Sequence, residues 1–241
     1  MNVVLIAGFW LGGDSWSEVV PLLEAAGLTV HTPTLAGLTS VDDDRSAVTL
    51  ASQTAEVVAL VDALAAGASP GEAPEKVVLV GHSGGGAIIH GVVDARPERV
   101  ARAIYVDSGP TPNGVAINPQ LEVTGTDAPL PPWEDFDEVD LRDLTEEQLA
   151  QFRERAVPEP ARVARDEQQL TNPARYEVPI TVITCTFQRS EIEEAIAAGV
   201  PYFAELPLMA RSTIVELPTG HWPQFTRPRE LAEHIVAAVG V

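Results

Sequence analysis

Alternation between strand-like and helix-like stretches constrains the fold of this chain more than any other feature. Short apolar runs with β-branched residues, each suited to a buried strand, recur at residues 3–7, 28–31, 77–80, 103–106, 180–184 and 213–217. Most stretches between them have the period of an amphipathic helix, as at residues 16–26, 51–66, 87–94 and 230–239. This alternation predicts an α/β fold with a mostly parallel sheet of about six strands and helices on both faces.

One long segment interrupts the alternation. Residues 109–160 contain no β-type run, are rich in Pro and acidic residues, and have a helical pattern at 144–156. An irregular loop of this length is unusual inside a compact domain. We therefore expect a core made of residues 1–108 and 161–241, with residues 109–160 inserted as a short helical lid. Residues 67–75 are mostly turn formers, which predicts a surface loop.

Residues 77–89 read VVLVGHSGGGAII, a G-x-S-x-G motif between a buried strand and an apolar helix. A serine on such a sharp strand-to-helix turn has a strained backbone, and Gly81 and Gly85 leave room for the turn. The hydroxyl is then presented at a helix N-terminus, where free N–H groups favour a developing oxyanion. This setting predicts that Ser83 is a catalytic nucleophile.

A serine hydroxyl becomes a good nucleophile only when a neighbouring base takes its proton. Of the five histidines, four fall within predicted strands or helices or within the serine motif itself. His221 alone lies in a loop, in the sequence PTGHW at residues 218–222, after the last strand and before the last helix. That loop belongs to the sheet edge where the serine turn opens, so we expect His221 to be the base.

Two carboxylates compete for the third position, the acid that orients the imidazole. The loop after the strand at residues 180–184 is the usual place, but Gln188 stands where the acid is expected. Glu191 follows closely, although an acidic residue there also suits the first turn of a helix over residues 191–198. Asp107 ends the strand beside the one that carries Ser83. We expect Asp107 to be the acid, with Glu191 as the alternative.

An oxyanion needs two N–H groups aimed at one point. The backbone of Gly84 supplies one, and the glycine-rich loop at residues 7–13 predicts Phe9 as the second donor. Apolar side chains near these loops and in the inserted segment are expected to line the substrate pocket: Trp10, Trp133, Phe136, Leu149, Phe152 and Trp222. The side chains of the inserted segment can equally seat it on the core, and Trp10 can equally be a core residue.

Composition narrows the possible partners. The 35 acidic and 15 basic residues give a net charge of −20, which disfavours nucleic acids and anionic membranes as partners. Cys185 is the only cysteine, so neither a disulfide framework nor a Cys-rich metal site is expected, and we predict no metal and no cofactor. The N-terminus reads as a strand rather than a signal peptide. We expect a cytoplasmic monomer or homodimer acting on a small molecule.

The order Ser83, Asp107, His221 on alternating strands and helices resembles the α/β-hydrolase superfamily over essentially the whole chain. The chain is similar to a compact group that includes bacterial carboxylesterases, plant methylesterases and hydroxynitrile lyases, through GFWLGGDSW at residues 8–16, TPTLAG at 32–37 and GHS at 81–83. The resemblance implies an α/β-hydrolase fold with a short lid, which residues 109–160 match in position.

The chain departs from this group in the loop after the first strand and at Gln188, where the group's late-strand aspartate is expected. Ala7 replaces the histidine that usually precedes the first glycine of the loop. Hydroxynitrile lyases use a lysine close to the triad, whereas Lys76 is the only lysine here and precedes the nucleophile strand. The resemblance therefore implies a hydrolase rather than a lyase.

Together these features predict a serine hydrolase that cleaves a carboxylic ester or lactone of a small, neutral to hydrophobic substrate through an acyl-enzyme. An acyltransferase, or a lactonase- or cyclase-type biosynthetic enzyme, would use the same triad and remains the alternative. A third possibility is a non-catalytic binding protein on a hydrolase fold, since fold does not fix function. The presence of both nucleophile and base counts against that third possibility.

Overall fold

The computed structural model describes residues 1–66 and 75–240, so nearly all of the surface loop expected at 67–75 lies outside the described residues. A parallel six-stranded sheet forms the centre, in the order β2-β1-β3-β4-β7-β8. The strands match the six predicted runs: β1 (Asn2–Ile6), β2 (Thr29–His31), β3 (Val77–His82), β4 (Val100–Val106), β7 (Ile180–Thr184) and β8 (Ser212–Glu216). The predicted fold class is confirmed.

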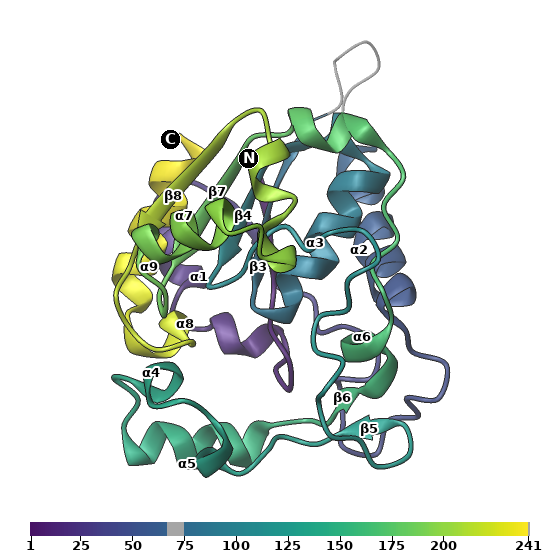
Figure 1. Cartoon of the computed structure of the whole chain (residues 1–241), viewed down its shortest axis with the longest axis vertical. Helices are drawn as coiled ribbons and strands as arrows, with labels where there is room; N and C mark the ends of the chain where they lie inside the picture. Colours follow the sequence, from purple (N-terminus) through teal and green to yellow (C-terminus); the bar gives the residue numbers. More distant parts are fainter. Residues whose placement is uncertain (67–74, 241) are drawn as a thin grey trace.

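Helices cover both faces of the sheet (Figure 1). On one face pack α2 (Leu50–Ala65), α3 (Gly84–Ala95) and α7 (Arg189–Ala197); on the other pack α1 (Val20–Ala25) and α9 (Pro228–Val239). Alternate residues of each strand point to opposite faces, so Val4 and Ile6 join the first cluster and Val3 and Leu5 the second. The central strands β1, β3, β4 and β7 are largely buried on both faces, which explains their continuous apolar runs.

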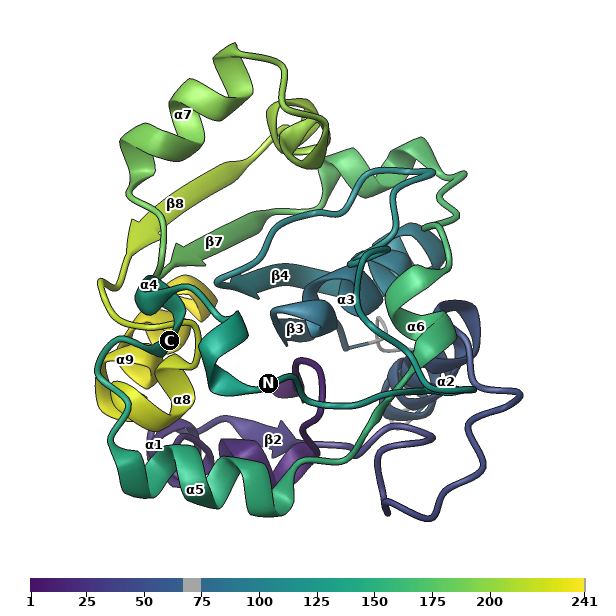
Figure 2. The ribbon, with the colours of Figure 1, turned by 60° about the horizontal axis from the view of Figure 1, so that its bottom comes forward.

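The inserted segment, residues 109–160, lies across the end of the sheet where β3 and β4 end (Figures 1 and 2). It contains α4 (Glu138–Leu141), α5 (Glu146–Arg155) and an antiparallel pair of short strands, β5 (Asp127–Ala128) and β6 (Glu159–Pro160). The sequence has no β-type run at either strand. Each strand has two residues, which is too short to leave an alternating pattern in the sequence.

Two further short helices complete the part of the fold near the site. α6 (Ala161–Arg165) follows β6, and α8 (Pro223–Thr226) follows the loop that contains His221. None of the helices in residues 1–66 and 75–240 has the length and apolar character needed to cross a membrane.

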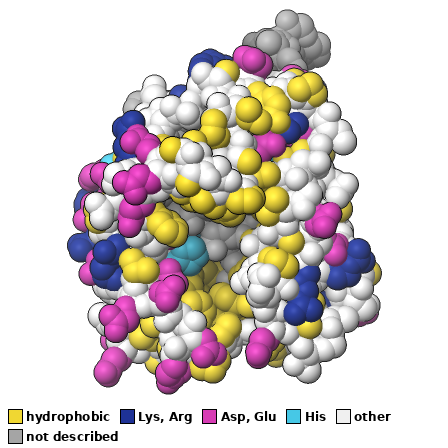
Figure 3. All heavy atoms as spheres, in the orientation of Figure 1, with side chains coloured by type: hydrophobic (Ala, Val, Ile, Leu, Met, Phe, Trp, Pro, Cys, Tyr) yellow, Lys and Arg dark blue, Asp and Glu magenta, His cyan; other side chains and the backbone are white. Residues whose placement is uncertain are grey.

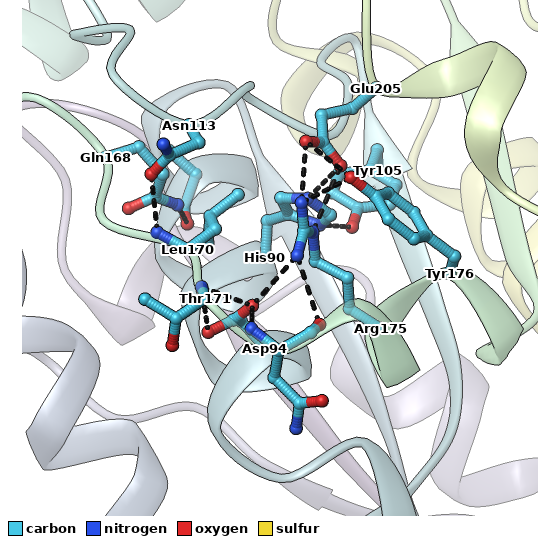
Figure 4. A network of polar contacts seen from close by, with 12 residues as sticks. His90, Asp94, Tyr105, Asn113, Gln168, Leu170, Thr171, Arg175, Tyr176 and Glu205 are labelled. Carbon is cyan, nitrogen blue, oxygen red and sulfur yellow. Dashed lines mark hydrogen bonds and ion pairs between the residues drawn. The ribbon is translucent and has the colours of Figure 1, made fainter.

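A buried polar network fixes helix α3 against the sheet (Figure 4). His90 Nδ1 lies 2.8 Å from the Tyr105 hydroxyl on β4, and its Nε2 lies 3.5 Å from Glu205. Arg175 forms ion pairs with Glu205 at 3.0 Å and with Asp94 at 3.3 Å. Burial lowers the pKa of His90, so this imidazole is neutral at pH 7. The network therefore rests on one cation shared between two carboxylates.

Candidate active site

Ser83 lies on the turn between β3 and α3, with φ of 51° and ψ of −123°. A positive φ is strained for a residue with a Cβ, and such strain is common at functional turns. The turn leaves no room for side chains around it, because a Cβ on Gly81 would lie 2.5 Å from the Gly85 carbonyl oxygen. A Cβ on Gly8 would lie 2.9 Å from the Ser83 Cβ. The glycines at positions 8, 81 and 85 thus allow the tight turn that presents the Ser83 hydroxyl above the sheet.

His221 and Asp107 complete a continuous hydrogen-bonded chain from Ser83. His221 Nε2 lies 2.8 Å from Ser83 Oγ, and His221 Nδ1 lies 2.6 Å from Asp107 Oδ2. The three residues come from the loops after β3, β8 and β4, which meet at one edge of the sheet. This geometry allows the imidazole to take a proton from the hydroxyl while the carboxylate orients the ring.

Asp107 is held as an anion by its surroundings. Its carboxylate is 2 % exposed and accepts N–H groups from Cys185 at 2.8 Å and Thr186 at 2.9 Å. Burial acts to raise the pKa of Asp107, but the hydrogen bonds from His221, Thr186 and Cys185 outweigh it and bring the pKa below its usual value. The loop after β7, where an acid was sought, therefore contributes backbone donors to the acid on β4.

The structure does not bring Glu191 to His221. The exposed Glu191 side chain accepts the N–H of Gln188 at 2.6 Å and completes a capping box at the start of α7. The alternative that Glu191 orients the base does not fit this geometry, because its carboxylate stabilises its own helix.

His82, which the sequence analysis set aside, also belongs to the site. It is fully buried, and its Nε2 lies 2.6 Å from the His221 carbonyl oxygen. Burial, followed by the nearby charge of His221, lowers the pKa of His82 to about 3. The ring is therefore neutral and donates its Nε2–H to His221. Its position directly before the nucleophile was the only sequence signal of this role.

The inserted segment holds the His221 loop from the other side. The His221 N–H donates to the Asp140 carbonyl at 2.8 Å, and Arg142 Nη2 donates to the Thr219 carbonyl at 2.6 Å. Gly220 is required between them, because a Cβ there would lie 2.3 Å from the Arg142 carbonyl oxygen. The base is thus fixed by contacts from both the core and the insertion.

A cleft of about 430 Å³ opens over these residues. Figure 3 shows a hollow on this face with hydrophobic side chains around it and a histidine at its rim. Phe9 and Gly84, the expected oxyanion donors, line the cleft beside Ser83. Its aromatic walls are Phe9, Trp10, Phe136, Phe187, Tyr202, Phe203 and Trp222.

Half of the predicted pocket residues do not line this cleft. Trp10, Phe136 and Trp222 do, whereas Trp133, Leu149 and Phe152 do not. Phe152 is buried, and its ring centroid lies 5.2 Å from that of Trp222 and 5.4 Å from that of Trp133. The prediction was wrong for these residues, because Phe152 on α5 is buried in the core and Trp133 packs against it. Trp133 and Phe152 seat the inserted segment there.

The sequence profile of the alpha/beta hydrolase family matches residues 3–234. This chain belongs to that family. Within the ranges that the structure describes, no group of three or more His, Cys, Asp or Glu side chains is arranged to hold a metal ion.

Relatives of this hydrolase include ester-cleaving enzymes. It is 28% identical to a pyrethroid hydrolase of Sphingobium wenxiniae, over 97% of this chain and 86% of the relative. It is 32% identical to a carbendazim hydrolyzing esterase of a Nocardioides species, over 44% of this chain and 41% of the relative. The hydrolase is thus grouped with esterases, as its sequence predicted.

Solved structures agree with this hydrolase in fold. A methylesterase from Arabidopsis superposes with a TM-score of 0.74 at 22% identity, covering 99% of this chain and 98% of that one. An extracellular α/β-hydrolase from a Paenibacillus species superposes with a TM-score of 0.77, also at 22% identity, over 99% of this chain and 98% of that one. At this identity the likeness establishes the fold alone.

Proposed function

We propose that this hydrolase cleaves a carboxylic ester or lactone with Ser83 as nucleophile, His221 as general base and Asp107 as the orienting carboxylate. The observation that carries the proposal is the unbroken chain of contacts, 2.8 Å from Ser83 to His221 and 2.6 Å from His221 to Asp107. The relatives named as pyrethroid hydrolase and esterase support ester bonds as the target.

The reaction has two halves. Ser83 Oγ attacks the carbonyl carbon while its proton passes to His221 Nε2, and the N–H groups of Gly84 and Phe9 hold the oxyanion. His221 then gives the proton to the leaving alcohol, which leaves an acyl group on Ser83. Water attacks this ester as His221 Nε2 takes one of its protons, and His221 then gives that proton to Ser83 Oγ as the acyl–oxygen bond breaks and the carboxylic acid departs.

The cleft favours neutral, hydrophobic substrates. Its walls are largely aromatic, and the residues that line it include two carboxylates, Asp107 and Asp140, but no Lys or Arg. An anionic group on the substrate would find no cation there and would face the Asp140 carboxylate. Neutral esters of small or medium size fit a cleft of about 430 Å³.

A series of p-nitrophenyl esters of increasing acyl length tests the proposal. Ser83→Ala is expected to lower kcat at least about 1,000-fold, and Asp107→Asn about 100-fold or more. Glu191→Gln, which changes only the cap of α7, serves as the matched carboxylate control and keeps wild-type turnover. Wild-type turnover by Ser83→Ala would overturn the assignment, and a wild type without turnover on any ester would favour a binding protein.

The acyltransferase alternative differs only in the acceptor that releases the acyl group. Adding a primary alcohol to the assay separates the two, because an acyltransferase forms the new ester in preference to the free acid. We expect the free acid to dominate.

A further inference from the structure

Trp10, directly after the expected oxyanion donor Phe9, has an unusual backbone. Its φ is 66°, a left-handed conformation that residues with bulky side chains rarely adopt. Such a conformation persists only where surrounding contacts impose it. The Trp10 N–H belongs to the planar peptide unit between Phe9 and Trp10. A contact that holds this N–H therefore fixes the peptide plane that directly follows the Phe9 N–H.

The contact comes from Glu159 in the inserted segment. Glu159 Oε2 accepts the Trp10 N–H at 3.2 Å, and the Glu159 side chain is buried with 1% exposure. The same part of the insertion holds Trp10 twice more, since Trp10 Nε1 donates to the Ala128 carbonyl at 3.0 Å and the Val157 N–H donates to the Trp10 carbonyl at 3.0 Å. Ala128 and Glu159 are paired across β5 and β6. These two strands and Val157, just before β6, thus hold Trp10 at three points.

Glu159 has no ion-pair partner among the residues that the structure describes. Arg45 is a cation that lowers the pKa of Glu159 through its charge, but its own contacts are with other groups. It donates to the Pro158 carbonyl at 2.8 Å and to the Asp43 carbonyl at 3.0 Å, and it pairs with Asp127 at 3.6 Å. Burial without a paired cation raises the pKa of Glu159 to about 8, against smaller lowering effects of the Trp10 N–H and Arg45. At pH 7 the group is mostly a neutral carboxylic acid.

The neutral state suits the position of this group. Glu159 lines a small cavity of about 10 Å³ together with Phe9 and Gly84, which are the two expected oxyanion donors. A carboxylate there would oppose the negative charge that develops on the substrate oxygen, whereas a neutral acid can accept the Trp10 N–H without adding charge.

We propose that Glu159 is a positioning residue that holds the Trp10 N–H and thereby aims the Phe9 N–H at the oxyanion. This inference rests on the proposed function. It links the inserted segment to the chemical step, because Glu159 in that segment orients the loop that contains Phe9 and Trp10. Glu159 and Trp10 are 149 residues apart in sequence.

The test compares Glu159→Met, which removes the acceptor, with Glu159→Gln, which keeps a neutral one. At pH 7 Glu159→Met is expected to lower kcat about 10- to 100-fold with KM changed less than about threefold. Glu159→Gln is expected to stay within about threefold of wild type. Glu154→Met, the same exchange at an exposed position of α5, controls for altering the inserted segment.

Inhibitor binding separates positioning from a general loss of structure. A trifluoromethyl ketone forms an oxyanion with Ser83, and its affinity for Glu159→Met should fall by the same factor as kcat/KM. The corresponding alcohol, which forms no oxyanion, should bind as it does to wild type. Wild-type kcat in Glu159→Met, or an equal loss of affinity for both inhibitors, would overturn the proposal.

A second measurement decides the matter if Glu159→Met does not fold, as judged by circular dichroism. In wild type kcat/KM should fall above about pH 8 as Glu159 ionises, and Glu159→Gln should lack this fall. Arg45 and Asp127 are the charged groups around Glu159. Superimposable pH profiles of kcat/KM for wild type and Glu159→Gln would contradict the proposal. Equal ester turnover by wild type and Ser83→Ala would instead contradict the proposed function.

Discussion

The imidazole of His82 donates a hydrogen bond to the carbonyl oxygen of His221, across 2.6 Å. The residue before the nucleophile thus holds the backbone of the residue expected to activate it. His82 is fully buried and neutral, so its ring donates this hydrogen bond from Nε2–H without carrying a charge.

His82 should make the protein sensitive to acid. Its folded-state pKa of about 3 lies below the ordinary value of 6.5, so the unfolded chain binds more protons between these values and stability falls as pH falls. From pH 6.5 to 5 the free energy of unfolding should drop by about 2 kcal/mol more in wild type than in His82→Gln. Urea unfolding at several pH values measures this, and parallel curves would contradict it.

Asp140 should select against anionic substrates. Its carboxyl lies near His221 and lines the cleft, and burial, with Asp107 and Asp137 nearby, raises its pKa above the usual value. Asp140→Asn at pH 8 should raise kcat/KM about fivefold for a p-nitrophenyl hemisuccinate, corresponding to about 1 kcal/mol of removed repulsion. The acetate ester should change much less, and equal changes for both esters would refute a charge effect.

Gly8 should tolerate no side chain. A Cβ there would lie 2.8 Å from His82 Nδ1 and 2.9 Å from the Ser83 Cβ. Gly8→Ala should destabilise the protein by about 1–3 kcal/mol and lower kcat, because the strained turn must shift. Gly109→Ala is the matched control, since the nearest described atom, on Tyr202, would lie 3.9 Å from its Cβ. Thermal unfolding and ester assays on both variants check this, and similar behaviour of the two would count against it.

Arg175 should be a strong determinant of stability. Its removal leaves Glu205 and Asp94 without their shared cation in a buried setting. Arg175→Met should lower the free energy of unfolding by about 3–5 kcal/mol. Arg96→Met breaks the more exposed pair with Asp62 and should lower the free energy of unfolding much less. Urea unfolding compares them, and equal costs would show that burial of the network contributes little.

The sequence was sufficient to predict the six-stranded sheet, because each central strand is buried on both faces and therefore appears in the sequence as an apolar run. It was insufficient for β5 and β6, which are too short to carry a pattern. The choice between Asp107 and Glu191 depends on how β4 aligns with β7, where the Asp107 N–H meets the Ile183 carbonyl. Local sequence does not encode that register.

The sequence analysis missed residues whose role depends on a contact with a distant part of the chain, because such contacts exist only in the folded protein. Glu159 lies in a Pro-rich stretch that has no motif, and its role depends on its contact with Trp10. Phe152 and Trp133 were assigned to the pocket because an apolar face in the insertion is equally suited to ligand or core. Only the packing of the folded segment decides between them.

The inserted segment contacts both loops around Ser83, through Trp10 on one side and through the Asp140 and Arg142 contacts with the His221 loop on the other. It is therefore not an interchangeable module. Transplanting the corresponding segment from a relative in order to alter selectivity would also replace the supports of both loops. Engineering of this enzyme should instead vary individual wall residues of the cleft and keep the insertion's backbone intact.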